Sequence, residues 1–164
     1  MHDLSLYLLE VLENSVRAGA TRIDTTIVAD RVGDRLTIAV EDDGPGLPVR
    51  PDQALDPFFT TKHHKKTGLG LSLFRQAAED AGGELVVGRS ERLGGARVCA
   101  GMSLSNVDRP PLGDVAATFA TMVVTNPAVM FGVELRDEDS RVTVHGAGLP
   151  SQLLRMKAYQ RALR

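Results

Sequence analysis

The sequence contains a single cysteine, which excludes both an intrachain disulfide and a metal site built from several thiolates. Cys99 lies in an alternating, strand-like stretch, where an inert buried thiol is expected. No thiol chemistry is therefore predicted, and we expect a reducing compartment.

An excess of charge of one sign and a long apolar run are also absent. The 19 Lys and Arg residues nearly balance the 21 Asp and Glu residues, so the net charge of -2 creates no overall field that would attract nucleic acid or acidic membranes. The longest aliphatic-rich run, Val115 to Val124, is shorter than the roughly 20 residues of a spanning helix, and no cationic leader with an apolar stretch opens the chain. We expect a cytoplasmic protein that binds no nucleic acid and inserts into no membrane.

The 164 residues, of which 43% are apolar, suffice for one compact domain with a modest appendage. Apolar residues at helical spacing predict helices at residues 4–17 and 69–81. Alternating residues predict two hairpins, with strands at residues 22–29, 35–41, 84–88 and 96–104. Helices on one face of such a sheet bury both apolar surfaces, so we predict an α/β fold. Residues 1–105 would form a self-sufficient two-layer sandwich of helices on a mixed, mostly antiparallel sheet.

Residues 106–164 are predicted to form a small α/β extension. Segment 106–113 has the composition of a linker, and Asp114 can cap a helix that runs to Val124. Strands at residues 129–135 and 141–145 can pair across an acidic turn, and Ser151 can cap a basic C-terminal helix. The extension contains no chemical motif that we recognise.

The first residues that can carry chemistry lie on the N-terminal helix. Glu10, Asn14 and Arg17 share one stripe of this helix, largely opposite its leucines, because they are four and three residues apart. A carboxylate there can activate a nucleophile, and an amide oxygen suits a hard cation such as Mg²⁺. A solvated polar helix face explains the same spacing, which alone decides nothing.

A second motif, EDDGPGLP, follows the second predicted strand at residues 41–48. Asp42 at the strand end could accept a hydrogen bond from the exocyclic amine of a base, and Gly44 and Gly46 would leave room for a planar ring. A tight turn after a strand is the alternative interpretation.

A third motif, TGLGLS at residues 67–72, places two glycines before the second long helix, where free N–H groups and the helix dipole favour an anion such as phosphate. A glycine-containing helix entry would have the same sequence. The basic run at residues 62–66 could close over phosphates or remain a solvated loop.

Taken in order, these motifs resemble those of the GHKL superfamily, which includes gyrase-type topoisomerases, Hsp90-type chaperones, histidine kinases and mismatch-repair ATPases. ENSVRAGATRID, with Glu10 four residues before Asn14, resembles the N box, and EDDGPG resembles the G1 box. DPFFTTK at residues 56–62 resembles the F box of histidine kinases, and TGLGLS resembles the G2 box. The four boxes cover most of residues 4–105 and imply a Bergerat-type ATP-binding fold.

The resemblance also implies roles for individual residues. Asn14 would ligate a Mg²⁺ ion that bridges the phosphates of ATP, Asp42 would bind the adenine amine, and Glu10 would be the catalytic base. Residues 67–71 would line the phosphates beneath a lid formed by residues 62–66. The nucleotide-binding residues implied in this way are Asn14, Arg17, Asp42, Gly44, Gly46, Thr61, Lys62, Thr67, Gly68, Leu69, Gly70 and Leu71.

The sequence departs from the histidine-kinase pattern at two positions. Many histidine kinases carry a second Asn at the position of Glu10, and many carry Gly-Thr where this chain has Gly95-Ala96. The second departure implies the loss of one water-bridged adenine contact.

The resemblance leaves three functions open. The chain could transfer the γ-phosphate of Mg·ATP to a partner protein or hydrolyse ATP, in a signalling or regulatory role. It could be a serine kinase similar to the anti-sigma-factor kinases, or a non-catalytic binding module that ATP regulates. Because the first motif-bearing helix begins at Leu4, we expect no phosphoacceptor hairpin ahead of it. None of the histidines lies in a sequence like that around a phosphoacceptor histidine, so any acceptor is expected on another protein.

Overall fold

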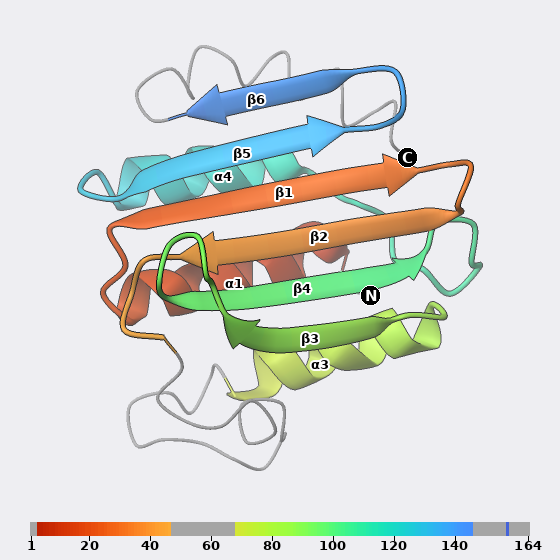
Figure 1. Cartoon of the computed structure of the whole chain (residues 1–164), viewed down its shortest axis with the longest axis horizontal. Coiled ribbons are helices and arrows are strands. Elements are labelled where there is room, and N and C mark those ends of the chain that lie inside the picture. The colour runs from red at the N-terminus through yellow and green to blue at the C-terminus, as the bar shows by residue number, and fades with distance from the viewer. Residues whose placement is uncertain (1–2, 47–67, 146–156, 158–164) are drawn as a thin grey trace.

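The computed structural model describes residues 3–46, 68–145 and 157 of the chain. In this part, three helices cover one face of a six-stranded sheet (Figure 1). We call the face away from the helices the outer face. The predicted two-layer α/β sandwich is thereby confirmed.

The N-terminal part of the fold begins with helix α1, Leu4–Arg17, which Asp3 caps by accepting a hydrogen bond from Leu6 N. Strands β1, Arg22–Asp30, and β2, Arg35–Asp42, form the first hairpin. Helix α3, Gly68–Asp80, precedes the second hairpin, which consists of β3, Glu84–Arg89, and β4, Ala96–Ser103. These elements match the predicted ones closely because each has a clear local periodicity.

The C-terminal part contributes one helix and two strands within the described residues. Helix α4, Val115–Thr125, is capped by Asp114, whose side chain accepts a hydrogen bond from Ala117 N, as predicted. Strands β5, Met130–Arg136, and β6, Arg141–His145, form the predicted hairpin. The basic helix expected after Ser151 lies outside the described residues, apart from the single residue Lys157.

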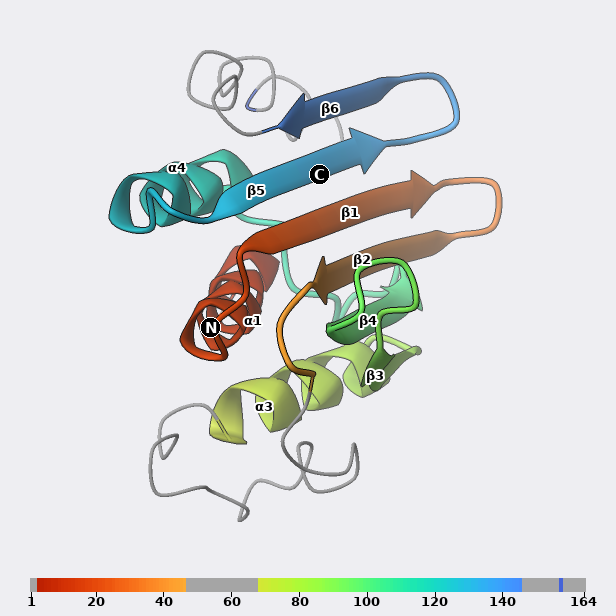
Figure 2. The same cartoon turned by 60° about the vertical axis from the view of Figure 1, so that its left-hand side comes forward.

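The strand order is β3-β4-β2-β1-β5-β6. Strands β1 and β5 pair in parallel, and every other neighbouring pair is antiparallel, so the sheet is mixed and mostly antiparallel, as predicted. Figure 2 shows α1 between α4 and α3 beneath this sheet, and α1 contacts both helices.

The core fills the space between the sheet and the helices. Strands alternate between buried residues on the helix side and partly exposed residues on the outer face. In β1, Ile23, Thr25 and Ile27 are buried, while Asp24 and Thr26 between them are partly exposed. Cys99 lies on the outer face of β4 and is only partly buried, which corrects the expectation of a buried thiol.

The sheet continues across the predicted boundary between residues 105 and 106. Ile23 and Ile27 of β1 stand opposite Phe131 and Leu135 of β5, and all four are at most 1% exposed. Leu4 N also donates to Pro111 O at 2.9 Å. The division of the chain at residue 105 stays a prediction.

None of the helices in the described ranges is both long and apolar enough to cross a membrane.

Candidate nucleotide site

The buried carboxylate of the second predicted motif belongs to Asp42, the last residue of β2, which is only 4% exposed. Its Oδ2 accepts a hydrogen bond of 2.6 Å from the hydroxyl of Ser15 on α1. Its Oδ1 accepts hydrogen bonds of 3.0 Å from Gly44 N and from Ala96 N. Three separate segments of the chain therefore hold this carboxylate in one orientation.

The hydrogen-bonding capacity of Asp42 is not exhausted by these contacts. A carboxylate offers about four acceptor positions, and three of them are used. The remaining position on Oδ2 suits a donor such as the exocyclic amine of adenine. The residues present therefore fit the base that the sequence predicts.

Gly95 packs directly against Asp42. Its N–H donates to the Asp42 carbonyl at 3.0 Å, and a Cβ at this position would overlap Oδ1 of Asp42. Only glycine permits this approach, which also places Ala96 N on the carboxylate. The β3–β4 turn is thus part of the site, although the sequence marked Gly95-Ala96 only as a departure.

Ser15 is the site residue that the sequence analysis missed. It is 6% exposed and follows Leu8, Val11 and Leu12 at helical spacing, so it occupies a position on the apolar face of α1. A hydroxyl on that face needs a hydrogen-bond partner, and this was the available signal.

Asp43 points to the other side and fastens the loop to the start of β1. It accepts hydrogen bonds from Thr21 N at 2.8 Å, Thr21 Oγ1 at 2.6 Å and Arg22 N at 2.9 Å. Burial alone would raise the pKa of Asp43, but these hydrogen bonds outweigh it and the net shift is downward. Gly46 follows with a φ of +85°, a left-handed conformation that favours glycine.

Glu10 lies against the first turn of α3. A Cβ on Gly70 would overlap Oε2 of Glu10, so the carboxylate occupies the space that any other residue would fill. The stacked rings of Tyr7 and Phe74, 5.3 Å apart, join α1 to α3 on the same side. Burial raises the pKa of Tyr7, and the carboxylates of Asp80 and Glu10 raise it further. The fold thus joins the first and third motifs.

Asn14 and Arg17 are close neighbours on α1, as the spacing predicts. Arg17 donates to Asn14 Oδ1 at 3.3 Å and lies 3.8 Å from Glu13. Because Asn14 is partly exposed, its amide oxygen can exchange this contact for a hard cation. The described ranges contain no cluster of three or more His, Cys, Asp or Glu side chains that could hold a metal.

Several predicted site residues cannot be placed. Thr61, Lys62 and Thr67, with the F box and the basic run, lie outside the described residues.

Gly68 and Leu69 begin α3, whose first N–H groups have no partner within the helix. The side chain of Leu71 is 8% exposed and belongs to the core, so only its backbone is available to a ligand.

Comparison with known proteins agrees with this geometry. Residues 2–106 match the family described as histidine kinase-, DNA gyrase B- and HSP90-like ATPase. Because the match spans most of the chain, the protein belongs to this ATPase family, which is the GHKL superfamily expected from the motifs.

Sensor histidine kinases are among the curated relatives. The chain is 37% identical over 99 residues to the sensor-type histidine kinase PrrB of Mycobacterium leprae. The matched segment covers 58% of this chain and 22% of PrrB. It is 33% identical over 97 residues to the sensor histidine kinase CpxA of Escherichia coli, which covers 56% of this chain and 21% of CpxA. The matches thus span about a fifth of these relatives.

Solved structures support the same fold. The Aquifex aeolicus MutL ATPase domain complexed with ADP matches with a TM-score of 0.53 and 15% identity, over 95% of this chain and 70% of that one. The N-terminal domain of a DNA repair protein matches with a TM-score of 0.54 and 16% identity, over 88% of this chain and 52% of that one. The Bergerat-like α/β sandwich is therefore shown by structure as well as by sequence.

Proposed function

We propose that the protein binds Mg·ATP between α1, the Asp42 loop and the start of α3. The observation that carries this proposal is the buried Asp42 carboxylate, held by Ser15, Gly44 and Ala96 with one acceptor position left for an amine. A carboxylate this constrained can recognise a base through a single hydrogen bond, because it loses little freedom on binding.

The phosphates would lie at the N-terminal turn of α3, where backbone N–H groups and the helix dipole favour anions. Asn14 would contribute its amide oxygen to the Mg²⁺ ion that accompanies ATP. Bound Mg·ATP would supply a γ-phosphoryl group that can be transferred. The chain would supply the position of that group and the charges around it.

Glu10 is our candidate for the catalytic base. Its carboxylate is partly buried and lies beside Gly70, at the helix turn proposed for the phosphates. From there it could orient and deprotonate a water molecule or an acceptor side chain.

We infer that the γ-phosphate passes to a partner protein or to water in a signalling or regulatory role. The identity shared with PrrB and CpxA favours phosphoryl transfer. The acceptor would belong to another protein in the cytoplasm. A serine kinase and a non-catalytic, ATP-regulated binding module remain outcomes of the test.

The test follows γ-labelled ATP with Mg²⁺ and measures free phosphate, protein-bound label and ATP affinity. The variants are Asn14→Ala and Glu10→Gln, and Glu79→Gln on the exposed side of α3 is the matched control. If only the first two variants abolish phosphate release, the protein is an ATPase with Glu10 as its base. Binding without release or label would indicate a partner-dependent kinase or a binding module. Absence of ATP binding by the wild type would contradict the proposal.

A further inference from the structure

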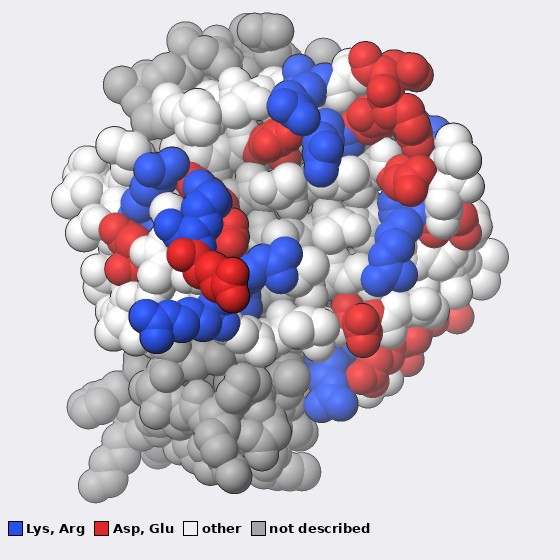
Figure 3. Space-filling model, viewed as in Figure 1, with Lys and Arg blue, Asp and Glu red and all other residues white. Residues whose placement is uncertain are grey.

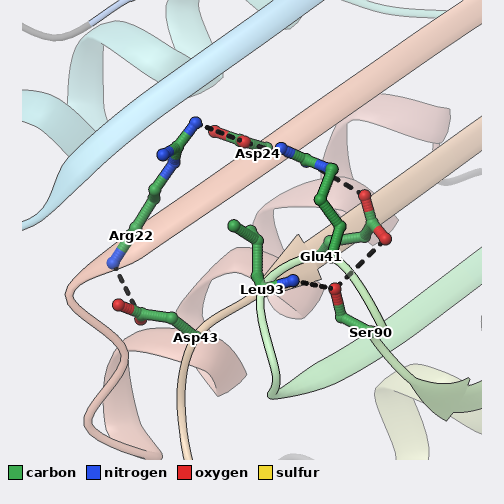
Figure 4. A network of polar contacts seen from close by, with 7 residues as sticks. Arg22, Asp24, Glu41, Asp43, Ser90 and Leu93 are labelled. Atoms are coloured by element: carbon green, nitrogen blue, oxygen red, sulfur yellow. Dashed lines mark hydrogen bonds and ion pairs between the residues drawn. The ribbon is translucent and has the colours of Figure 1, made fainter.

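Ionic contacts tie the β3–β4 turn, Ser90 to Gly95, to the outer face of the sheet. A single guanidinium nitrogen of Arg92 lies 2.9 Å from Asp24 of β1 and 3.1 Å from Glu41 of β2. Figure 4 shows Asp24 and Glu41 beside each other at the ends of these strands, with Ser90 and Leu93 of the turn next to Glu41. Both acidic side chains are at most 20% exposed.

The contacts around Arg92 form a chain of alternating charges. Arg22 approaches Asp24 at 3.2 Å from one side, and Arg97 approaches Glu41 at 3.7 Å from the other. On the outer face, basic and acidic side chains intermingle in the cluster on the left of Figure 3. The hydrogen bonds that Arg92 donates to Asp24 and Glu41 raise the pKa of its guanidinium, so Arg92 stays charged.

Ser90 holds the base of the turn together by hydrogen bonds. Its hydroxyl donates to Glu41 Oε1 at 3.2 Å and accepts from Leu93 N at 3.0 Å. Its backbone N–H donates to Gly95 O at 2.7 Å. The acidic residue that anchors Arg92 therefore also anchors the start of the turn.

The end of the same turn holds the residue after Glu41. Gly95 N donates to Asp42 O, and Ala96 N donates to Asp42 Oδ1. Adjacent residues of a strand point to opposite faces, so Glu41 meets the turn on the outer face while Asp42 meets it on the buried side. The turn therefore forms hydrogen bonds with the end of β2 on both faces of the sheet.

We propose that Arg92 is a positioning residue for adenine recognition. It acts from the outer face by keeping the β3–β4 turn against Glu41, which keeps the N–H groups of Gly95 and Ala96 on Asp42. This inference rests on the proposed function of Asp42. Arg92 need not contact the nucleotide, so its loss changes the selection of the base and leaves phosphate binding intact.

The experiment compares ATP with inosine triphosphate, which carries the same phosphates and lacks the amine of adenine. Calorimetry on the full chain with Mg²⁺ measures both affinities for the wild type and Arg92→Met. Arg141→Met is the matched control, because it removes an outer-face ion pair in which Arg141 of β6 lies 2.9 Å from Glu134 of β5. We expect a wild-type preference for ATP, reduced about fivefold in Arg92→Met and unchanged in Arg141→Met.

Two further measurements separate positioning from a general loss of stability. Arg92→Lys retains the charge but not the planar guanidinium, and its preference for ATP should be intermediate. Salt should lower the preference of the wild type for ATP more than that of Arg92→Met, because salt screens the ion pairs of the exposed Arg92 side chain. Its effect on phosphate binding cancels in the ratio of the two affinities, because both nucleotides carry the same phosphates.

The outcomes distinguish the two proposals. If the wild type prefers ATP and Arg92→Met keeps the full preference, the positioning role is wrong and the proposed function stands. If the wild type binds ATP without preferring it to inosine triphosphate, adenine recognition by Asp42 is wrong, and the role of Arg92 with it. If the wild type binds neither nucleotide, the proposed function itself is wrong.

Discussion

At the scale of single residues, the site depends on one hydroxyl in an otherwise apolar position. Ser15 is the only side chain among the described residues shown to donate to the Asp42 carboxylate, because the other two donors are backbone N–H groups. Without this hydroxyl, Oδ2 would lose its partner in a site that is 4% exposed.

We therefore predict that Ser15→Ala lowers the free energy of unfolding by roughly 1–3 kcal/mol and weakens ATP binding about tenfold. Ser105→Ala is the control, because it also removes a hydroxyl that donates to an aspartate, in this case Asp34 at the other end of β2. Chemical denaturation and calorimetry measure the two effects. Equal ATP affinity in Ser15→Ala and the wild type would contradict the role of Ser15.

Glu10 and Gly70 should also be energetically coupled. A methyl group at residue 70 would overlap the Glu10 carboxylate, so Gly70→Ala should destabilise the chain, and less so when Glu10→Ala has already made room. The double-mutant cycle should give a coupling of about 0.5–3 kcal/mol by urea denaturation. Gly88→Ala is the control, because no atom lies within 4 Å of the added methyl group. Additive effects of the two substitutions would show that the Glu10 carboxylate does not lie against Gly70 in solution.

At the scale of elements, nearly every described helix and strand could be predicted from the sequence. Their bounds differ from the predicted ones by at most one residue at either end, because helix formation and strand alternation depend on neighbours close in the chain. The pairing within each hairpin was also predicted, but the pairing of strands from different hairpins could not be. No local signal places β5 parallel to β1, or β4 rather than β3 beside β2.

The turn between β1 and β2 shows how a short element is held by distant ones. Asp34, with a φ of 52°, accepts hydrogen bonds from Ser103 Oγ at 2.7 Å, Ser105 N at 2.8 Å and Ser105 Oγ at 2.8 Å. The Ser103 hydroxyl, followed by the two Ser105 donors, lowers the pKa of Asp34 below its ordinary value of 3.8.

This shift predicts a pH-dependent contribution to stability. Because the pKa is lower in the folded state, the contribution is complete above the unfolded-state pKa of 3.8 and disappears as the pH falls through the folded-state pKa. Asp34→Asn should lower the thermal midpoint by a few degrees at neutral pH and by much less at about pH 2. Asp108→Asn, at an exposed aspartate of segment 106–113, is the control. A difference that persists unchanged at low pH would contradict the ionic origin of the effect.

At the scale of the whole molecule, the C-terminal extension completes the sheet of the ATPase domain. Removal of residues 106–164 would turn β1 into an edge strand and uncover Ile23 and Ile27, which now stand opposite Phe131 and Leu135. A buried isoleucine contributes about 1.5–3 kcal/mol.

We expect a chain that ends at residue 105 to fold with a free energy of unfolding at least about 3 kcal/mol below that of the whole chain. Denaturation of both chains, monitored by circular dichroism, measures the difference. Equal free energies of unfolding would show that the extension does not stabilise residues 1–105. Failure of the short chain to fold at all would contradict the predicted self-sufficient domain.

The sequence by itself determined the local elements, the order of the four motifs and the membership of the ATPase family, because each is written in residues close together along the chain. Only the tertiary structure decided which distant residues meet. Ser15 and Asp42 are 27 positions apart, and Asp42 and Ala96 are 54 apart. Such contacts depend on how strands pair and helices pack, so the arrangement around Asp42 follows from the fold as a whole.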